Sequence, residues 1–249
     1  MKKILFLDTE TNGLPVNFKA PPSPDNWPRL VQVAWILAND NGDILSEHTY
    51  IIQPDGFDIN PESAKIHGIT TERARAEGLP LQDVIACLEE SLIGCDYVVC
   101  HNVGFDRPVI VSEYMRLVGT LGRAWADTAR YPNIKHFCTM QMTTPIMRLP
   151  SPYAGQYKWP KLDELYQFLF LQEVPGRETF HDALIDVRAT AKCFFKLKEL
   201  KQKPPDMEQY GYQVSRSYDE ESGWMEEYGE KAYYNHKAVY DHFNPETVR

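Results

Sequence analysis

The chain has 249 residues, of which 43% are hydrophobic and 24% are charged, and its formal net charge is −9. This composition excludes a wholly disordered or fibrous chain, and the negative charge argues against a generally basic surface that coats nucleic acid. No stretch approaches the ~18 apolar residues of a membrane span, and the apolar run at residues 4–7 is too short for a signal peptide.

The first part of the chain predicts three strands. Residues 3–8 contain the apolar run 4–7, and we expect them to form a buried strand. Residues 30–37 follow a period of two that places Val31, Val33, Trp35 and Leu37 on one face, which is typical of a second strand. Asn-Gly at 41–42 is a hairpin signal, so we expect an antiparallel partner over about residues 46–52. A proline-rich loop, residues 15–28, separates the first two strands.

From residue 60 the pattern changes to alternating helices and strands. Asn60 followed by Pro61 is typical of a helix start. We expect Pro108 to be tolerated in the first turn of a later helix, and Asp182 to cap the last one. In chain order, the remaining predicted elements are helix 82–92, strand 97–100, helix 105–118, strand 136–139, helix 162–170 and helix 183–200.

Composition changes after residues 203–205, Lys-Pro-Pro. Residues 201–249 hold six Lys/Arg and ten Asp/Glu, a net charge of −4, together with nine aromatic residues. This is too aromatic for a simple acidic disordered tail. We therefore predict a domain over residues 1–200 and an aromatic, acidic C-terminal extension over 201–249, which packs on the domain or on a partner.

The five cysteines are odd in number and form no C-x-x-C pair. We expect them to be reduced thiols of a cytoplasmic protein, without structural zinc and without membrane association.

The first pair of candidate site acids lies at the end of the first predicted strand. Asp8 and Glu10 are two residues apart, so their carboxylates point to the same side. Acids that emerge from a core strand need partners, because a bare buried carboxylate is costly. The alternative is a solvated strand end.

Two further segments carry acids. Asp106 opens a helix directly after the strand at 97–100, and Asp186 lies one turn into the last helix, five residues after His181. Each has an ordinary alternative, because first-turn acids are favoured by the helix dipole and His181 is also consistent with a surface residue near a helix start.

The three segments together predict one site, because strand ends and helix starts of α/β proteins are where sites usually form. Four carboxylates in one pocket would repel one another, and hard divalent cations remove that conflict. Oxygen ligands without cysteine suit two Mg²⁺ or Mn²⁺ ions. Two such ions can activate a water and stabilise the leaving oxygen of a phosphodiester, and His181 is suited to act as the general base.

The motifs Asp-Thr-Glu at 8–10, His-Asn-Val-Gly-Phe-Asp at 101–106 and His-Asp-Ala-Leu-Ile-Asp at 181–186 resemble those of the DEDDh, or DnaQ-like, exonucleases. This family includes polymerase proofreading subunits, RNase T and the TREX enzymes. The resemblance covers about residues 1–200. It implies an α/β ribonuclease-H-like fold with a central five-stranded mixed sheet, three of its strands antiparallel, flanked by helices.

The resemblance also implies roles for the site residues. Asp8 would bridge both metal ions, Glu10 and Asp186 would complete the site of the water-activating ion, and Asp106 would hold the second ion. His181 would take the proton of the attacking water. The reaction would be hydrolysis of the 3′-terminal phosphodiester of single-stranded DNA or RNA, with release of nucleoside 5′-monophosphates.

Substrate contacts follow from the same resemblance. Thr11 and Leu14 fall where family members contact or wedge the terminal nucleotide, and Ile66 with His67 resembles a second contact segment. Asn102 is a further candidate. The alternatives are that His67 ends a helix before a glycine C-cap and that Asn102 only orders its loop.

Other functions stay open from the sequence. The chain is alternatively a proofreading subunit of a DNA polymerase with a partner at residues 201–249, an exoribonuclease, or a nuclease-like binding scaffold without activity. Residues 158–161, Lys-Trp-Pro-Lys, are a candidate for contact with the strand backbone, as are Lys19 and Trp27, although a surface loop is the simpler interpretation of 158–161.

Overall fold

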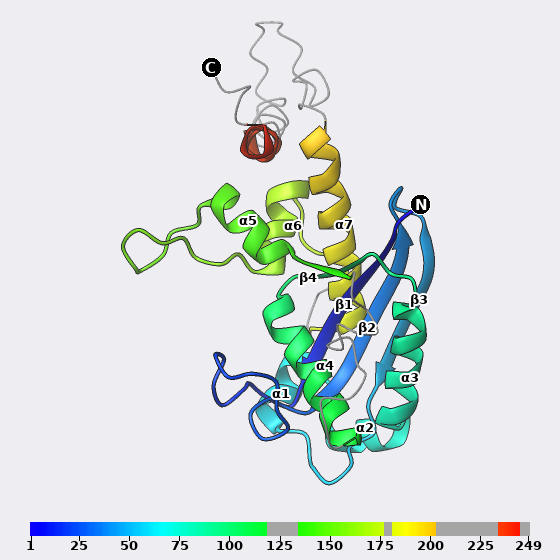
Figure 1. Cartoon of the computed structure of the whole chain (residues 1–249). Coiled ribbons are helices and arrows are strands. Elements are labelled where there is room, and N and C mark those ends of the chain that lie inside the picture. Colours follow the sequence, from blue (N-terminus) through cyan, green and yellow to red (C-terminus); the bar gives the residue numbers. More distant parts are fainter. Residues whose placement is uncertain (119–133, 177–180, 203–233, 245–249) are drawn as a thin grey trace, which may run out of the picture. The chain divides into compact units, whose positions relative to one another are not determined.

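The computed structural model describes residues 1–118, 134–176, 181–202 and 234–244 (Figure 1). The chain forms two compact units, residues 1–138 with 175–191 and residues 139–174 with 192–249. Among the described residues, no helix combines the length and the apolar character needed to cross a membrane. The boundary at residue 200 stays a prediction.

The first unit is built on a five-stranded sheet of order β3-β2-β1-β4-β5, which confirms the predicted sheet. Strands β1, β2 and β3 pair antiparallel, whereas β4 pairs parallel with β1 and β5 parallel with β4. The strand bounds are β1 Lys3–Thr11, β2 Leu30–Asn39, β3 Ile44–Ile51, β4 Tyr97–Cys100 and β5 Lys135–Cys138.

Burial along β2 is more complete than the predicted period of two. All ten residues of β2 are buried, because this strand lies between β1 and β3 and both of its faces are covered. The turn into β3 uses Gly42 at φ +96°, a left-handed conformation that glycine adopts without strain. Strand β3 lies at the edge of the sheet and has no fully buried residue.

Helices α3 and α4 lie along one face of the sheet (Figure 1). Their apolar residues Val84, Leu88 and Ile110 share a core with Leu7 of β1 and Trp35 of β2. The helices of this unit before β5 are α1 Pro61–His67, α2 Thr71–Glu77, α3 Leu81–Leu92 and α4 Val103–Val118.

Several predicted boundaries need correction. Helix α4 begins at Val103, so Pro108 lies in its second turn rather than the first, where it cannot donate to the Gly104 carbonyl. Thr139 is not the end of β5 but the first residue of α5.

The prediction of a helix start at Asn60 is confirmed, because its side chain accepts a hydrogen bond from the Glu62 amide at 2.9 Å.

The second unit is helical. It contains α5 Thr139–Met147, α6 Leu162–Phe170, the C-terminal part of α7 Ala183–Gln202 and a helix over residues 234–243. This last helix caps its neighbours: Asn235 and His236 donate to the carbonyls of Phe168 and Leu169 in α6. Asn244 donates to the carbonyl of Lys201 in α7 at 3.0 Å. The described part of the extension therefore packs on its own chain, by satisfying carbonyls that helix ends leave open.

Candidate active site

Strand β1 delivers the first two acids of the site. Its residues 4–7 are buried, and the strand then continues into Asp8 and Glu10, which are only partly buried. Glu10 is paired with Gln32 of the antiparallel neighbour β2. The apolar part of the strand thus fixes the backbone in the core while both acids come to the end of the sheet.

Helix α4 delivers Asp106, whose exposure is only 3%. Burial raises the pKa of Asp106 to about 7; hydrogen bonding, chiefly from Thr9, opposes this rise, and the charge of Asp186 adds to it. The Thr9 hydroxyl donates to Oδ1 of Asp106 at 2.8 Å. Thr9 was not among the predicted site residues, and its only signal in the sequence is its place between the two acids of the first motif.

Helix α7 delivers Asp186, which is 5% exposed. The predicted cap is confirmed, because Oδ1 of Asp182 accepts hydrogen bonds from the amides of Leu184 and Ile185. Gln32 of β2 holds this helix start on the sheet: its side chain donates to Asp182 at 3.0 Å and accepts from the Ala183 amide at 3.1 Å. Gln32 was not among the predicted site residues either.

Three of the predicted residues converge most tightly. One ligand atom each of Glu10, His181 and Asp186 lies within 4.8 Å of the others. Nδ1 of His181 is 3.5 Å from Oδ2 of Asp186, and half of the His181 side chain is exposed. Two ligands of one ion at 2.0–2.2 Å stand at most ~4.4 Å apart, so this spacing is close to that of a metal site.

Asp8 and Asp106 lie outside this group of three but belong to the same surroundings. The pKa of the buried Cys100 thiol is raised by burial and further by the charges of Asp106 and Asp8, which places both acids near the end of β4. Acids from β1, α4 and α7 therefore lie near one another, and their joint role in one site stays a prediction. Carboxylate oxygens with one imidazole are a donor set for a divalent cation.

The predicted substrate contacts differ in exposure. Leu14 is 72% exposed and Ile66 56% exposed, whereas Thr11 is buried and its hydroxyl donates to the Gly13 carbonyl at 2.8 Å. The carbonyl of Ile66 accepts a hydrogen bond from the His181 amide at 2.9 Å, so this segment holds the backbone of the third motif. The carbonyl of Asn102 accepts hydrogen bonds from the amides of Phe105 and Asp106 in the first turn of α4.

His67 is buried at 4% exposure at the end of α1, and Gly68 follows as a left-handed C-cap at φ +72°. Its Nδ1 accepts from the Ile69 amide at 3.2 Å. Burial lowers the pKa of His67; the backbone of Thr11 partly offsets this, and the charge of His181 adds to the lowering. His67 therefore ends a helix before a glycine C-cap and also lies near His181 of the site.

Comparison with known proteins gives one family match. The profile of the RNase T family, described as exonuclease, matches residues 5–194. No curated protein matches the chain in sequence.

Solved structures of exonuclease I are similar in fold. Escherichia coli exonuclease I in complex with a dT13 oligonucleotide has a TM-score of 0.61 at 21% identity, covering 81% of this chain and 42% of that chain. Exonuclease I from Methylocaldum szegediense has a TM-score of 0.58 at 21% identity, covering 89% and 49%. The chain thus spans less than half the length of these structures.

Proposed function

The chain belongs to the RNase T family of exonucleases, which are hydrolases, and we propose that it removes nucleotides from the 3′ ends of single-stranded DNA. Its mixed sheet and helices form the ribonuclease-H-like exonuclease fold. The products would be nucleoside 5′-monophosphates. DNA is placed before RNA because similar structures hold single-stranded DNA oligonucleotides.

The observation that carries this proposal is the convergence of Glu10, His181 and Asp186 within 4.8 Å, beside the buried Asp106. These residues come from strands and helices that are far apart in the sequence. If these acids were only a solvated strand end or a first-turn helix acid, their side chains would have no reason to lie close together. A binding scaffold would have no need to hold a buried carboxyl with a raised pKa next to a second acid.

We propose Mg²⁺ or Mn²⁺ as the ions. Exonucleases of this family use divalent metals, and one similar structure is the zinc-bound form of the Escherichia coli exonuclease I complex with single-stranded DNA. Glu10, Asp186, Asp8 and Asp106 would hold the ions, and oxygen ligands favour Mg²⁺ and Mn²⁺. When bound, such ions polarise a water and offset the charge that develops on the scissile phosphate.

His181 would move the proton. Its Nδ1 faces Asp186, which orients the ring, so Nε2 is the nitrogen that takes the proton of the attacking water. The Ile66 carbonyl fixes the His181 backbone, and Thr9 keeps Oδ1 of Asp106 in place. The exposed Leu14 and Ile66, with Thr11, His67 and Asn102, are proposed to contact the terminal nucleotide.

The test is product analysis on matched labelled DNA and RNA strands with Mg²⁺ or Mn²⁺. We expect nucleoside monophosphates from the 3′ end, abolished by EDTA and by Asp8→Ala or Asp186→Ala. Glu90→Ala removes an exposed acid of α3 and is the matched control, with unchanged activity expected. Full activity of either site variant, or no product with Mn²⁺, would contradict the proposal. Degradation of RNA but not of DNA would show that the substrate is RNA.

A further inference from the structure

Residues 148–161 of the second unit form an ordered excursion between α5 and α6, here named the 148–161 hairpin. Pro150 and Tyr157 make an isolated antiparallel bridge, and the Lys158 amide donates to the Leu149 carbonyl at 3.0 Å. The turn closes where the Gln156 amide donates to the Tyr153 carbonyl at 3.2 Å. Its backbone is therefore fixed by hydrogen bonds.

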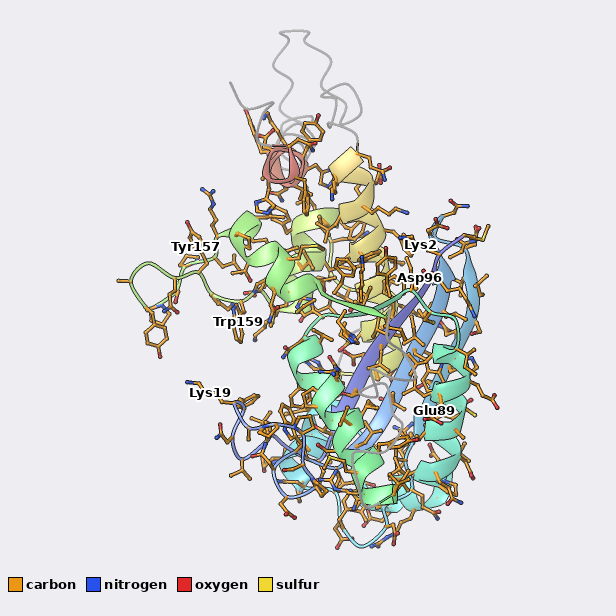
Figure 2. All side chains as sticks on the ribbon, viewed as in Figure 1. Lys2, Lys19, Glu89, Asp96, Tyr157 and Trp159 are labelled. Carbon is orange, nitrogen blue, oxygen red and sulfur yellow. The ribbon has the colours of Figure 1, made fainter. Side chains whose placement is uncertain are left out.

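This hairpin presents aromatic rings to solvent. Every residue from 152 to 159 is exposed, including Tyr153 at 69%, Tyr157 at 47% and Trp159 at 61%. Tyr157 and Trp159 stand on the excursion between α5 and α6 (Figure 2). Large aromatic side chains usually contribute to stability by burial, so three exposed rings on an ordered hairpin are not explained by folding.

The charge of the hairpin is opposite to that of the chain. Residues 148–161 contain Arg148, Lys158 and Lys161 and no acid, whereas the whole chain has a net charge of −9. Lys158 pairs with Glu164 in the first turn of α6, and Glu164 also accepts from the Lys161 amide at 2.7 Å. One acid thus anchors the base of the hairpin while the rings remain exposed.

We propose that the 148–161 hairpin is a stacking surface for single-stranded nucleic acid. Aromatic rings interleaved with cations are the features that bind single strands irrespective of sequence, since every base offers a flat face and every linkage a phosphate. A duplex hides the faces of its bases within the stack. The inference rests on the proposed function and adds a second contact for the strand, besides the terminal nucleotide.

The test measures binding without hydrolysis. Fluorescently labelled oligothymidylates of about 4 to 16 nucleotides, the range of site sizes for single-strand binding modules, are titrated with the full chain in EDTA and followed by anisotropy. Trp159→Ala should weaken binding of the longest strand by about 5- to 150-fold, as expected for loss of one stacked base. Trp159→Phe, which keeps an aromatic face, should retain most of the affinity.

A second arm tests the charges. Neutralising two cations with the double variant Arg148→Gln, Lys161→Gln should lower the slope of log affinity against log salt by about 1.4. Leu45→Ala, which removes an exposed apolar side chain from β3, is the control and should bind like the parent chain. Thermal melting of each variant confirms that it is folded.

The outcomes separate this surface from the proposed function. If the parent chain releases nucleotides and Trp159→Ala binds as tightly as the parent, the proposed stacking surface is wrong and the proposed exonuclease activity is supported. Binding that depends on the hairpin, without any release of nucleotides in Mn²⁺, would contradict the exonuclease alone. Binding of duplex as tightly as of single strands, or self-association lost in Trp159→Ala, would also overturn the surface.

Discussion

His181 joins the site by a side chain that is half in solvent, with its Nδ1 3.5 Å from Asp186. A general base contributes typically ~10²–10⁴-fold to a rate. We therefore expect His181→Ala to lower the turnover number by ~10²–10⁴-fold with a nearly unchanged KM, measured on a labelled single strand at saturating Mn²⁺. His242→Ala, at an exposed position of the C-terminal helix, should be neutral. Turnover retained in His181→Ala would exclude this histidine as the base.

Asp106 connects the site to stability. Its pKa in the folded chain is about 7, raised chiefly by burial, whereas an aspartate in an unfolded chain titrates near 3.9. Between these values the folded state binds the additional proton, so the free energy of unfolding falls as the pH rises from about 4 to 7.

This linkage is measurable in EDTA by urea denaturation at the two ends of this range, near pH 4 and above pH 7. The parent chain should be less stable at the higher pH by on the order of a few kcal/mol, and Asp106→Asn should flatten the dependence. Addition of Mn²⁺ should restore stability at the higher pH, since an ion bound only by the folded state stabilises it. An identical pH dependence in parent and Asp106→Asn would show that Asp106 is not the group responsible.

At the scale of elements, helix α4 ties the proline-rich loop to the sheet. The fully buried Glu113 accepts from Arg29 at 2.9 Å and from the Leu30 amide at 2.7 Å, and it pairs with Arg116 at 3.1 Å. Arg116 in turn donates to carbonyls of residues 24–28 of the loop. The sequence shows the loop only as a run of prolines, whereas the structure shows what anchors it.

Because Glu113 is buried between two cations, its removal leaves charges and an amide without their acceptor. We expect Glu113→Ala to lower the free energy of unfolding by about 3–5 kcal/mol, measured in urea. Glu113→Gln keeps an acceptor for the Leu30 amide and should cost less. A loss below about 1 kcal/mol in Glu113→Ala would show that the two arginines find other partners or solvent.

Elements with a strong apolar period were predictable and those without it were not. Strands β1 and β2 and helix α3 lie where runs and regular spacing of apolar residues predicted them. Helix α2, Thr-Glu-Arg-Ala-Arg-Ala-Glu, buries only Ala74 and offers no such period. Helix α5 contains three threonines and Pro145, which disfavour helix in isolation.

At the scale of the whole molecule, the net charge of −9 opposes extended contact with a nucleic-acid backbone. A site that grips a strand end through metal ions and stacking does not need a basic surface. We expect single strands to bind more tightly than a long duplex of the same sequence, and duplex binding to disappear first as salt is raised. Titration of both at two ionic strengths checks this, and equal salt-resistant binding of duplex would contradict it.

The acidic motifs are visible in the sequence alone, and the chemistry proposed for this protein follows from them. Motifs of fixed spacing at strand ends and helix starts made five residues candidates for the proposed site: Asp8, Glu10, Asp106, His181 and Asp186. The sheet followed from apolar periodicity, which is a local property of the chain.

The distances between the acids and His181, and the side chains that hold them in place, are visible only in the folded chain. Glu10, His181 and Asp186 form the closest group, Thr9 holds Asp106, and Gln32 holds the start of α7. Thr9 is marked in the sequence only by its place between the two acids of the first motif, and Gln32 by no motif at all. Their partners are 97 and 150 residues away in the chain, and such distant hydrogen bonds exist only once the fold has brought the segments together.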